Sequence, residues 1–507
     1  MSGEWNLKDL LQGFDVVGAL VDCRVVGLSL DSRVLRPGEV FLACAGSVTH
    51  GLTFAREAVQ RGAAAVVYEV TPGGTENNFL DRWREQAGSL PFVGVGDLRL
   101  RVGEIAARFH GNPTHELRVI GVTGTNGKSS CCYYIAQALH SDEEPCGVVG
   151  TLGYGRVGAL RVGEHTTPDA VTLQALFAEL LATGVRRVVM EVSSHALSQG
   201  RVNGVEFDIA VFTNLTHDHL DYHGDIENYA RAKRQLFFAP QLRAAVINGD
   251  DDYGSKLLAS LPERVEAVCF SVADGCDEVD VPRVVRGEVT RIDRGGLDMR
   301  IDSPWGSATL RTELLGRFNA SNLLASFAAL CQLGVPFAVA VERLAEVRSV
   351  PGRMEHFGGD ARRPLVVVDY AHTPDALLQV LQTLRELCAH DLWCVFGCGG
   401  DRDRQKRSKM GAIAEHIADH VIVTDDNPRH EDPQTIIAQI LSGLERPERA
   451  IVISDRALAI RTAVSRAAVE DIVLVAGKGH EDYQQVGDRR VPFSDRAHVS
   501  TLLQEVA

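Results

Sequence analysis

The sequence predicts an α/β protein built from three successive parts. With 507 residues the chain is too long for one hydrophobic core, because single cores stop growing at about 250 to 300 residues. Short β-branched runs alternate along it with longer helical patterns, which is typical of parallel sheets covered by helices. A Pro351-Gly352 pair interrupts this alternation. We therefore predict domains at residues 1–98, 99–350 and 351–507.

The first part contains two short apolar runs, VFLACAG and AAAVVYE, that are typical of strands. Between them LTFAREAVQRGA has the spacing of an amphipathic helix. This pattern predicts a small α/β domain.

The second and third parts each contain four apolar runs that end at polar or glycine residues. In the second part they are RVIGVT, RRVVMEV, DIAVFTN and AAVING, and in the third LVVVDYA, LWCVFGCGG, HVIVTDD and IVLVAGKG. Ligands of open α/β sheets bind outside the carboxyl ends of parallel strands. The residues that follow these runs are therefore the candidates for function.

Composition argues against several classes of partner. A formal charge of −15 gives no general attraction for nucleic acid or an anionic membrane. The chain has neither a secretory signal pattern nor an apolar run long enough to span a bilayer. Its eleven cysteines form no C-x-x-C pair, which favours reduced thiols. We expect a cytoplasmic protein, and no pattern indicates a protein partner.

Residues 118–130, RVIGVTGTNGKSS, have the form of a phosphate-binding loop. An apolar strand leads through glycines into the helical pattern CCYYIAQALH, so backbone N–H groups and a helix N-terminus can hold phosphate. The standard P-loop has glycine where this chain has Val122. The alternative is a glycine-rich turn with a solvated lysine. The candidate phosphate ligands are Gly124, Thr125, Asn126, Gly127, Lys128, Ser129 and Ser130.

Residues 214–225, NLTHDHLDYHGD, suggest a metal site. His217, His219 and Asp221 match the start of the H-x-H-x-D-H pattern of zinc hydrolases, but the last histidine falls one residue late, at 223. A polar surface turn is the simpler alternative. Glu191 ends the strand VVMEV, where an acid can hold the magnesium of a bound nucleotide together with Ser129 and one histidine.

Eight motifs in one order identify the family that the chain resembles. They are G-T-N-G-K-S, M-E-V-S-S-H, N-L-T-H-D-H-L-D-Y-H-G, Y-A-R-A-K, G-R-F-N-A-S-N, P-G-R-M-E, D-Y-A-H-T-P and D-N-P-R. The chain resembles the Mur ligases from L-D-S-R at 30–33 to F-S-D-R at 493–496. The resemblance implies a small N-terminal UDP-binding domain, a central P-loop ATPase domain and a C-terminal Rossmann-like domain. It also implies a ligase of peptidoglycan precursor synthesis that joins an amino acid to a UDP-linked muramoyl peptide while ATP is split to ADP and phosphate.

The resemblance also implies roles for individual residues. Lys128, Glu191, His219 and Lys233 would form the catalytic centre, and Mg²⁺ would be held by Ser129, Glu191, His219 and a carbamate formed from CO₂ on Lys233. Without the resemblance, Lys233 would be read as a solvated helical lysine. Adenine, ribose and phosphate would be handled by Asn319, Arg353 and Asp369. The UDP part would contact Leu30, Ser32, Ser47, Val48 and Thr49, and the muramoyl peptide would contact Thr166, Thr167, Ser193, Gln199 and Arg201.

The stretch DDNPRHEDPQ predicts the incoming amino acid. In this family D-N-P-R accompanies meso-2,6-diaminopimelate, and enzymes that add L-lysine usually replace the arginine. The two amino acids differ by one distal carboxylate, which a guanidinium can hold with two parallel hydrogen bonds. Alternatively, Arg429 only neutralises neighbouring acids. The predicted pocket comprises Arg402, Asp426, Asn427, Pro428, Arg429, Gly477 and Glu481.

The acceptor is thus expected to be UDP-N-acetylmuramoyl-L-Ala-D-Glu. Three alternatives to this function remain: an L-lysine-adding ligase, a folylpolyglutamate-type ligase and a nucleotide-gated binding protein without activity. The folylpolyglutamate enzymes lack a UDP-binding domain, so residues 1–98 argue against that alternative. A zinc hydrolase would instead be active without ATP.

Overall fold

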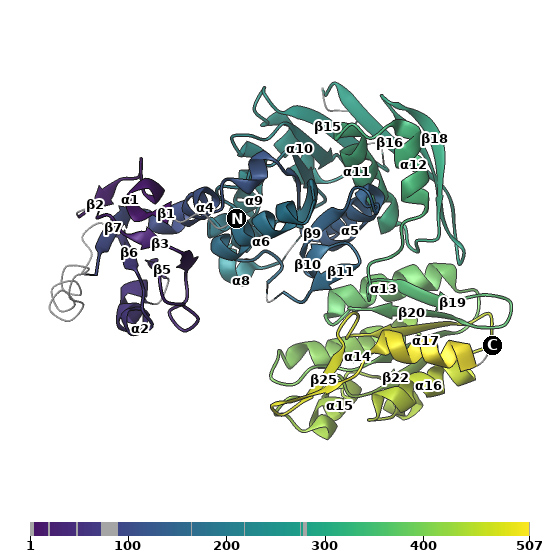
Figure 1. The fold of residues 1–507 in the computed structure, drawn as a ribbon. Helices are drawn as coiled ribbons and strands as arrows, with labels where there is room; N and C mark the ends of the chain where they lie inside the picture. The colour runs from purple at the N-terminus through teal and green to yellow at the C-terminus, as the bar shows by residue number, and fades with distance from the viewer. Residues whose placement is uncertain are drawn as a thin grey trace. The chain divides into compact units, whose positions relative to one another are not determined.

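The computed structural model describes residues 5–18, 21–46, 49–71, 90–163, 165–216, 218–273, 275–276 and 281–505. The chain divides into two compact units, residues 1–285 with 325–336 and residues 286–324 with 337–507. Both contain sheets and helices, so the predicted α/β class is confirmed (Figure 1). The predicted boundaries at 98 and 350 do not coincide with this division and stay a prediction.

The N-terminal part of the first unit contains a five-stranded sheet in the order β2-β7-β6-β5-β4. The strands are β2 (Val16–Val17), β7 (Phe92–Gly96), β6 (Ala65–Val70), β5 (Glu39–Ala43) and β4 (Gly27–Ser29). Val40 and Leu42 pack into one hydrophobic cluster and Phe41 into another, so β5 buries both faces of the sheet. The predicted amphipathic helix is a 3₁₀ turn, η1 (Gly51–Phe54), followed by α2 (Ala55–Gln60).

The strands of a second sheet that lie in this unit have the order β11-β10-β9-β12-β8-β13-β14-β15. Its strands are β8 (Arg118–Thr123), β9 (Cys146–Gly150), β10 (Gly153–Arg156), β11 (Ala159–Arg161), β12 (Arg187–Glu191), β13 (Ile209–Phe212), β14 (Ala244–Asn248) and β15 (Glu266–Ser271). β8 pairs in parallel with β12 and β13, so their carboxyl ends meet at one edge. This is the edge at which α/β proteins bind ligands.

Helices cover this second sheet and bury its apolar residues. They include α5 (Lys128–Leu139), α6 (Ala170–Ala182), α7 (Ser194–Ser198), α9 (Ile226–Arg234) and α10 (Asp252–Ala259). Helix α4 (Leu98–Phe109) instead packs into the hydrophobic cluster of the N-terminal sheet. The expectation that all cysteines are reduced is wrong for one pair, because Cys269 and Cys276 form a disulfide across a turn. The other nine cysteines, all within the described ranges, form no disulfide.

The second unit contains a six-stranded sheet in the order β19-β20-β24-β21-β22-β23. The strands are β19 (Glu355–Gly358), β20 (Leu365–Asp369), β21 (Leu392–Phe396), β22 (His420–Val423), β23 (Ile451–Val452) and β24 (Ile472–Ala476). All pairs are parallel except β19 with β20. Helices α13 (Pro374–Leu387), α14 (Gln405–Ile417), α15 (Pro433–Leu441), α16 (Arg456–Arg466) and α17 (Asp495–Glu505) belong to the same unit.

The sequence analysis did not predict two antiparallel elements of this unit. Strands β16 (Arg283–Asp293), β17 (Gly296–Ser303) and β18 (Gly306–Thr312) form a meander, in which buried residues alternate with exposed ones. Strands β25 (Tyr483–Val486) and β26 (Arg489–Pro492) form a hairpin. The hairpin contacts the loop after β22 through backbone hydrogen bonds.

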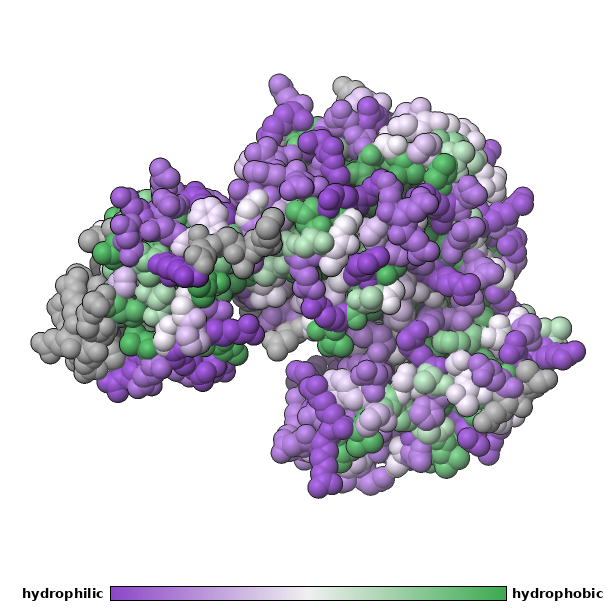
Figure 2. All heavy atoms as spheres, viewed as in Figure 1, coloured by the Kyte–Doolittle hydropathy of each residue, from purple (hydrophilic) through white to green (hydrophobic). Residues whose placement is uncertain are grey.

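Hydrophilic side chains cover most of the face shown in Figure 2, and apolar residues form small patches between them. None of the helices in the described ranges is both long and apolar enough to cross a membrane.

Candidate active site

The candidate phosphate loop lies between the end of β8 and the start of α5, so the predicted order of strand, loop and helix is present. Gly124 has φ 150°, and a Cβ there would lie 1.9 Å from the Thr213 hydroxyl oxygen, so only glycine fits. The Lys128 Nζ donates to the carbonyls of Gly124 and Thr125, at 2.9 and 2.8 Å. Gly127 has φ 81° and precedes Ser129 and Ser130 in the first turn of α5. The loop therefore presents a helix N-terminus and a cation together.

The segment after β13 holds the phosphate loop in place. Thr125 N–H donates to the Asn214 carbonyl and Asn126 N–H to the Asn214 side chain, both at 2.9 Å. The Thr213 hydroxyl donates to the Asn126 carbonyl at 2.6 Å. Sequence reasoning did not single out Thr213 or Asn214. Their position directly after a strand parallel to β8 was the available signal.

Glu191 and Ser129 form an oxygen-rich site at the carboxyl ends of β12 and β8. The Ser129 hydroxyl donates to Glu191 Oε2 at 3.0 Å, and Thr151 N–H donates to Oε1 at 2.7 Å. A Cβ on Gly150 would lie 2.4 Å from Glu191 Oε1, so the missing side chain makes room for this carboxylate. Hydroxyl and carboxylate oxygens are the ligands that Mg²⁺ prefers, so these residues fit that ion.

Lys233 is almost fully buried, with 1% of its surface exposed. Its Nζ donates to the Gly124 carbonyl at 2.7 Å and lies 4.3 Å from the centre of the Tyr229 ring. Burial, with a further contribution from the charge of Lys128, lowers the pKa of Lys233 to about 6. Within the described residues no carboxylate forms an ion pair with it. The helix α9 thus carries an amine, favoured in its neutral form, to the phosphate loop.

The predicted histidines are only partly defined. His219 has φ 53°, and its ring centre lies 4.9 Å from that of His195. His223 Nε2 lies 3.0 Å from the Ser194 hydroxyl. His217 and the side chain of Asp221 lie outside the described residues. Where the structure describes the chain, no three His, Cys, Asp or Glu side chains converge as a metal-binding group.

The five residues predicted to bind the muramoyl peptide form one connected hydrogen-bond network. Thr167 Oγ1 lies 3.3 Å from Ser193 Oγ, and Arg201 donates to the Thr167 carbonyl at 2.9 Å. Arg201 also donates to the Gln199 side chain at 2.8 Å. The Thr166 hydroxyl lies 3.0 Å from that of Thr151, which also contacts Glu191. The network therefore reaches the oxygen-rich site.

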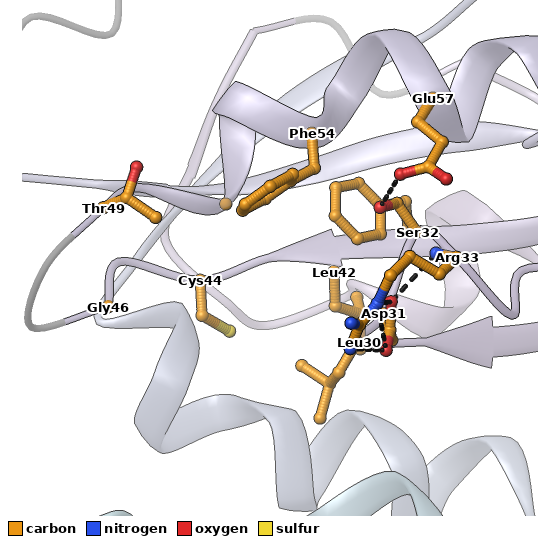
Figure 3. A pocket seen from close by; sticks show the side chains of 12 residues that line it. Leu30, Asp31, Ser32, Arg33, Leu42, Cys44, Gly46, Thr49, Phe54 and Glu57 are labelled. Atoms are coloured by element: carbon orange, nitrogen blue, oxygen red, sulfur yellow. Dashed lines mark hydrogen bonds and ion pairs between the residues drawn. The ribbon is translucent and has the colours of Figure 1, made fainter. Parts of the chain in front are cut away.

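The N-terminal sheet bears a cavity of about 480 Å³ that three predicted UDP-binding residues line: Leu30, Ser32 and Thr49. The Ser32 hydroxyl donates to Glu57 at 2.7 Å (Figure 3). Phe54, which sequence reasoning missed, lines the same cavity with 45% of its surface exposed. An exposed ring in a cavity is suited to stacking on a base. Ser47 and Val48 lie outside the described residues.

In the second unit, Arg353 lies close enough to Asp369 to act on its carboxylate electrostatically. Asp369 is buried, accepts N–H groups of Met354 and Ala371 at 2.8 Å each, and has its pKa raised by burial. The Arg353 guanidinium lies 4.9 Å from the centre of the Tyr370 ring. Asn319 is buried and donates to the Leu315 carbonyl at 2.8 Å.

The loop after β22 contains four of the residues predicted to bind the incoming amino acid, namely Asp426, Asn427, Pro428 and Arg429. Arg429 has φ 51°, a conformation that is strained for a residue other than glycine. The hairpin β25–β26 supports it, because Arg429 N–H donates to Gln485 O at 3.1 Å and Gly487 N–H donates to Arg429 O at 2.7 Å. The guanidinium donates to the Gly400 carbonyl at 2.7 Å. In the described residues it forms no ion pair with a carboxylate.

Asn427 and Glu481 are joined by Lys478, a residue that the sequence did not indicate. Lys478 is fully buried and donates to Asn427 Oδ1 and Glu481 Oε2 at 3.0 Å each. Asn427 Nδ2 donates to the same Glu481 oxygen at 2.9 Å. Gly477 has φ 118°, and a Cβ there would lie 2.6 Å from the Asp426 carboxylate. Arg402 is exposed in the loop after β21, and Pro428 is buried.

The alternative role for Arg429, neutralising nearby acids, does not match this geometry. Glu431 is held by Arg407, whose two terminal nitrogens each donate to a different Glu431 oxygen at 2.9 Å. Arg407 holds the pKa of Glu431 at about 2. Asp432 caps helix α15, and burial raises the pKa of Asp425 to about 6. Arg429 instead contacts a backbone carbonyl.

Comparison with known proteins identifies the family. The Mur ligase family, catalytic domain, matches residues 24–110, the Mur ligase middle domain matches 122–330, and the Mur ligase, glutamate ligase domain matches 352–479. The chain belongs to the Mur ligase family. It is an ATP-dependent ligase that forms amide bonds, and Mg²⁺ is the general metal of this family.

Several relatives bear the same name, UDP-N-acetylmuramoyl-L-alanyl-D-glutamate--2,6-diaminopimelate ligase. That of Coxiella burnetii is 48% identical over 474 residues, 94% of each chain, and that of Alkalilimnicola ehrlichii is 48% identical over 504 residues, 99% of each. A solved structure of that name has a TM-score of 0.72 and 36% identity, with 99% of both chains covered. Folylpolyglutamate synthase of Mycobacterium tuberculosis shares the fold, with a TM-score of 0.57 and 20% identity over 75% of this chain.

Proposed function

We propose that this chain joins meso-diaminopimelate to UDP-N-acetylmuramoyl-L-alanyl-D-glutamate, with ATP split to ADP and phosphate. The names of the relatives support this activity. The observation that carries it is Arg429, because its guanidinium contacts a carbonyl and is left without a carboxylate partner among the described residues. A distal carboxylate on the incoming amino acid supplies such a partner.

The reaction begins with activation of the acceptor, since a carboxylate does not form an amide in water unaided. A carboxylate oxygen attacks the γ-phosphorus of ATP, and ADP leaves. Lys128 stabilises the negative charge on the transferred group from its place at the loop. Bound Mg²⁺ supplies further positive charge, and Ser129 and Glu191 would hold it.

The second step forms the amide bond. The amine of diaminopimelate attacks the acyl carbon of the acyl phosphate, loses a proton and displaces inorganic phosphate. Thr166, Thr167, Ser193, Gln199 and Arg201 would hold the acceptor peptide during both steps, since they form one connected network. The cavity around Ser32 would hold the UDP end, which keeps the reacting end oriented.

Lys233 would carry the carbamate that the family resemblance implies. Its neutral amine nitrogen attacks the carbon of CO₂ and loses a proton, which leaves an anionic carbamate. Its place at the Gly124 carbonyl supports this assignment, because a carbamate there adds an oxygen ligand beside the phosphate loop. His219 would be a further metal ligand.

The test is an assay with ATP, Mg²⁺, the UDP-muramoyl dipeptide and either meso-diaminopimelate or L-lysine, scored by product mass. Sites that hold a substrate by a buried polar contact reject an analogue lacking it by about 10⁴ to 10⁵ in kcat/KM. We expect a ratio of this order in wild type. Truncating Arg429 to alanine should cost on the order of 2 to 5 kcal/mol in diaminopimelate recognition. A wild-type ratio near unity would reject the proposed selection.

A further inference from the structure

Arg407 is fully buried on helix α14, yet it lies on no motif that sequence analysis selected. Its Nη1 donates to Glu431 Oε2 at 2.9 Å and to Gln439 Oε1 at 2.6 Å. Its Nη2 donates to Glu431 Oε1 at 2.9 Å and to the Gly399 carbonyl at 3.1 Å. One guanidinium therefore joins the loop after β21, the loop after β22 and helix α15.

These two loops are the ones that hold the Arg429 guanidinium. The Gly400 carbonyl accepts from Arg429 Nη1, and Gly400 N–H donates to the Asn427 carbonyl at 2.9 Å. Glu431 also accepts Asp401 N–H at 2.7 Å, so its carboxylate ties the first loop to the second.

The contact between the loops is too close for side chains. A Cβ on Gly399 would lie 2.8 Å from Arg429 Nη1, and a Cβ on Gly400 would lie 1.9 Å from the Pro428 carbonyl oxygen. The direction of the Arg429 side chain therefore depends on the spacing of two backbone segments. Arg407 and Glu431 form a bidentate pair that fixes this spacing.

We propose that Arg407, acting through Glu431 and the Gly399 carbonyl, is a positioning residue for Arg429 and thereby helps to select the incoming amino acid. This inference rests on the proposed function. The planar guanidinium of arginine has several donors in fixed directions and can hold both loops at once, which a lysine ammonium cannot reproduce. When the Arg407 guanidinium is lost, Arg429 is still present but its side chain points in a different direction.

The test compares Arg407→Lys with Arg404→Ala. Arg404 also reaches Glu431, at 3.3 Å, but its side chain is 67% exposed, so it is the matched control. A displacement of about 1 Å can cost about 10²-fold in rate. We expect Arg407→Lys to lower the diaminopimelate-to-lysine ratio of kcat/KM by roughly 10- to 100-fold, mainly through KM for diaminopimelate. The KM values for ATP and the UDP substrate should stay unchanged, and Arg404→Ala should behave as wild type.

A purely structural role would reduce the amount of active enzyme and lower kcat for both amino acids without changing their ratio. That result, with Arg429→Ala still losing the ratio, would overturn the inference while leaving the proposed function intact. If wild type shows no preference, the proposed function itself fails. Should Arg407→Lys not fold, Glu431→Asp keeps the charge pair but shortens its reach, and the same loss of ratio is expected. An unchanged ratio in Glu431→Asp would contradict the inference.

Discussion

The side-chain nitrogen of Lys233 lies 2.7 Å from the carbonyl oxygen of Gly124, across 109 residues of sequence. This hydrogen bond joins helix α9 to the phosphate loop. Lys128 donates to the same carbonyl, so two lysines converge on one backbone oxygen. Burial disfavours the charged form of Lys233, and the nearby charge of Lys128 adds to this effect, so the more buried Lys233 is favoured as a neutral amine.

Replacing Lys128 by alanine should abolish most of the phosphoryl transfer. The lysine stabilises charge that develops in the transition state, and removal of one such preorganised group costs about 10² to 10³ in kcat. Only part of the Lys128 side chain is buried, so the fold should survive. Two measurements on the variant check this: its rate of ADP release and its melting temperature. Wild-type turnover in a folded Lys128→Ala protein would refute the assignment of the loop.

Lys233→Ala should be inactive. A small carboxylate such as acetate should partly restore its activity, because acetate can offer an oxygen ligand in place of the missing carbamate. Labelling with ¹³CO₂ should give a carbamate carbon signal in wild type that is absent in this variant. Lys256→Ala, at an exposed position of helix α10, is the control and should keep the signal. A plain amine in active, Mg²⁺-loaded enzyme would contradict the carbamate.

Gly400→Ala should damage recognition of the amino acid without affecting nucleotide binding. The added methyl group would lie 1.9 Å from the Pro428 carbonyl oxygen, so the two loops must separate. We expect a rise of about 10-fold or more in KM for diaminopimelate, since small displacements are costly at a binding site. Gly96→Ala is the control, because its nearest neighbour would be 3.8 Å away. Equal KM values in both variants would show that the loop contact is dispensable.

Asp425→Asn should stabilise the protein above pH 6 and have little effect near pH 4. Burial raises the pKa of Asp425 from 3.8 to about 6 in the folded state, so the folded protein binds more protons between these values. Stability is therefore lost as pH rises through this window, and the neutral asparagine avoids that loss. Melting temperatures at pH 4 and pH 8 measure it. Asp142→Asn, at an exposed position, removes the same charge and is the control.

The sequence predicted the strands that carry the site because buried parallel strands are continuous apolar runs. RVIGVT coincides with β8, and HVIV with β22. The phosphate loop and its position before α5 were equally predictable, since glycines and a helix pattern follow the strand.

The supports of the site were not predictable. Arg407 and Lys478 are charged residues, and their burial arises from partners far away in sequence, such as Glu431 and Asn427. The positive φ of Arg429 likewise depends on the β25–β26 hairpin rather than on its own neighbours. Local patterns report periodicity, and they carry no information on such distant pairings.

The hairpin has a consequence for the order in which the protein matures. The D-N-P-R loop obtains backbone hydrogen bonds from Gln485 and Gly487, which are synthesised more than fifty residues later. A nascent chain can therefore form its candidate phosphate loop before the hairpin that supports the proposed amino-acid pocket has been synthesised. The proposed discrimination among amino acids would thus be among the last properties that each newly made molecule acquires.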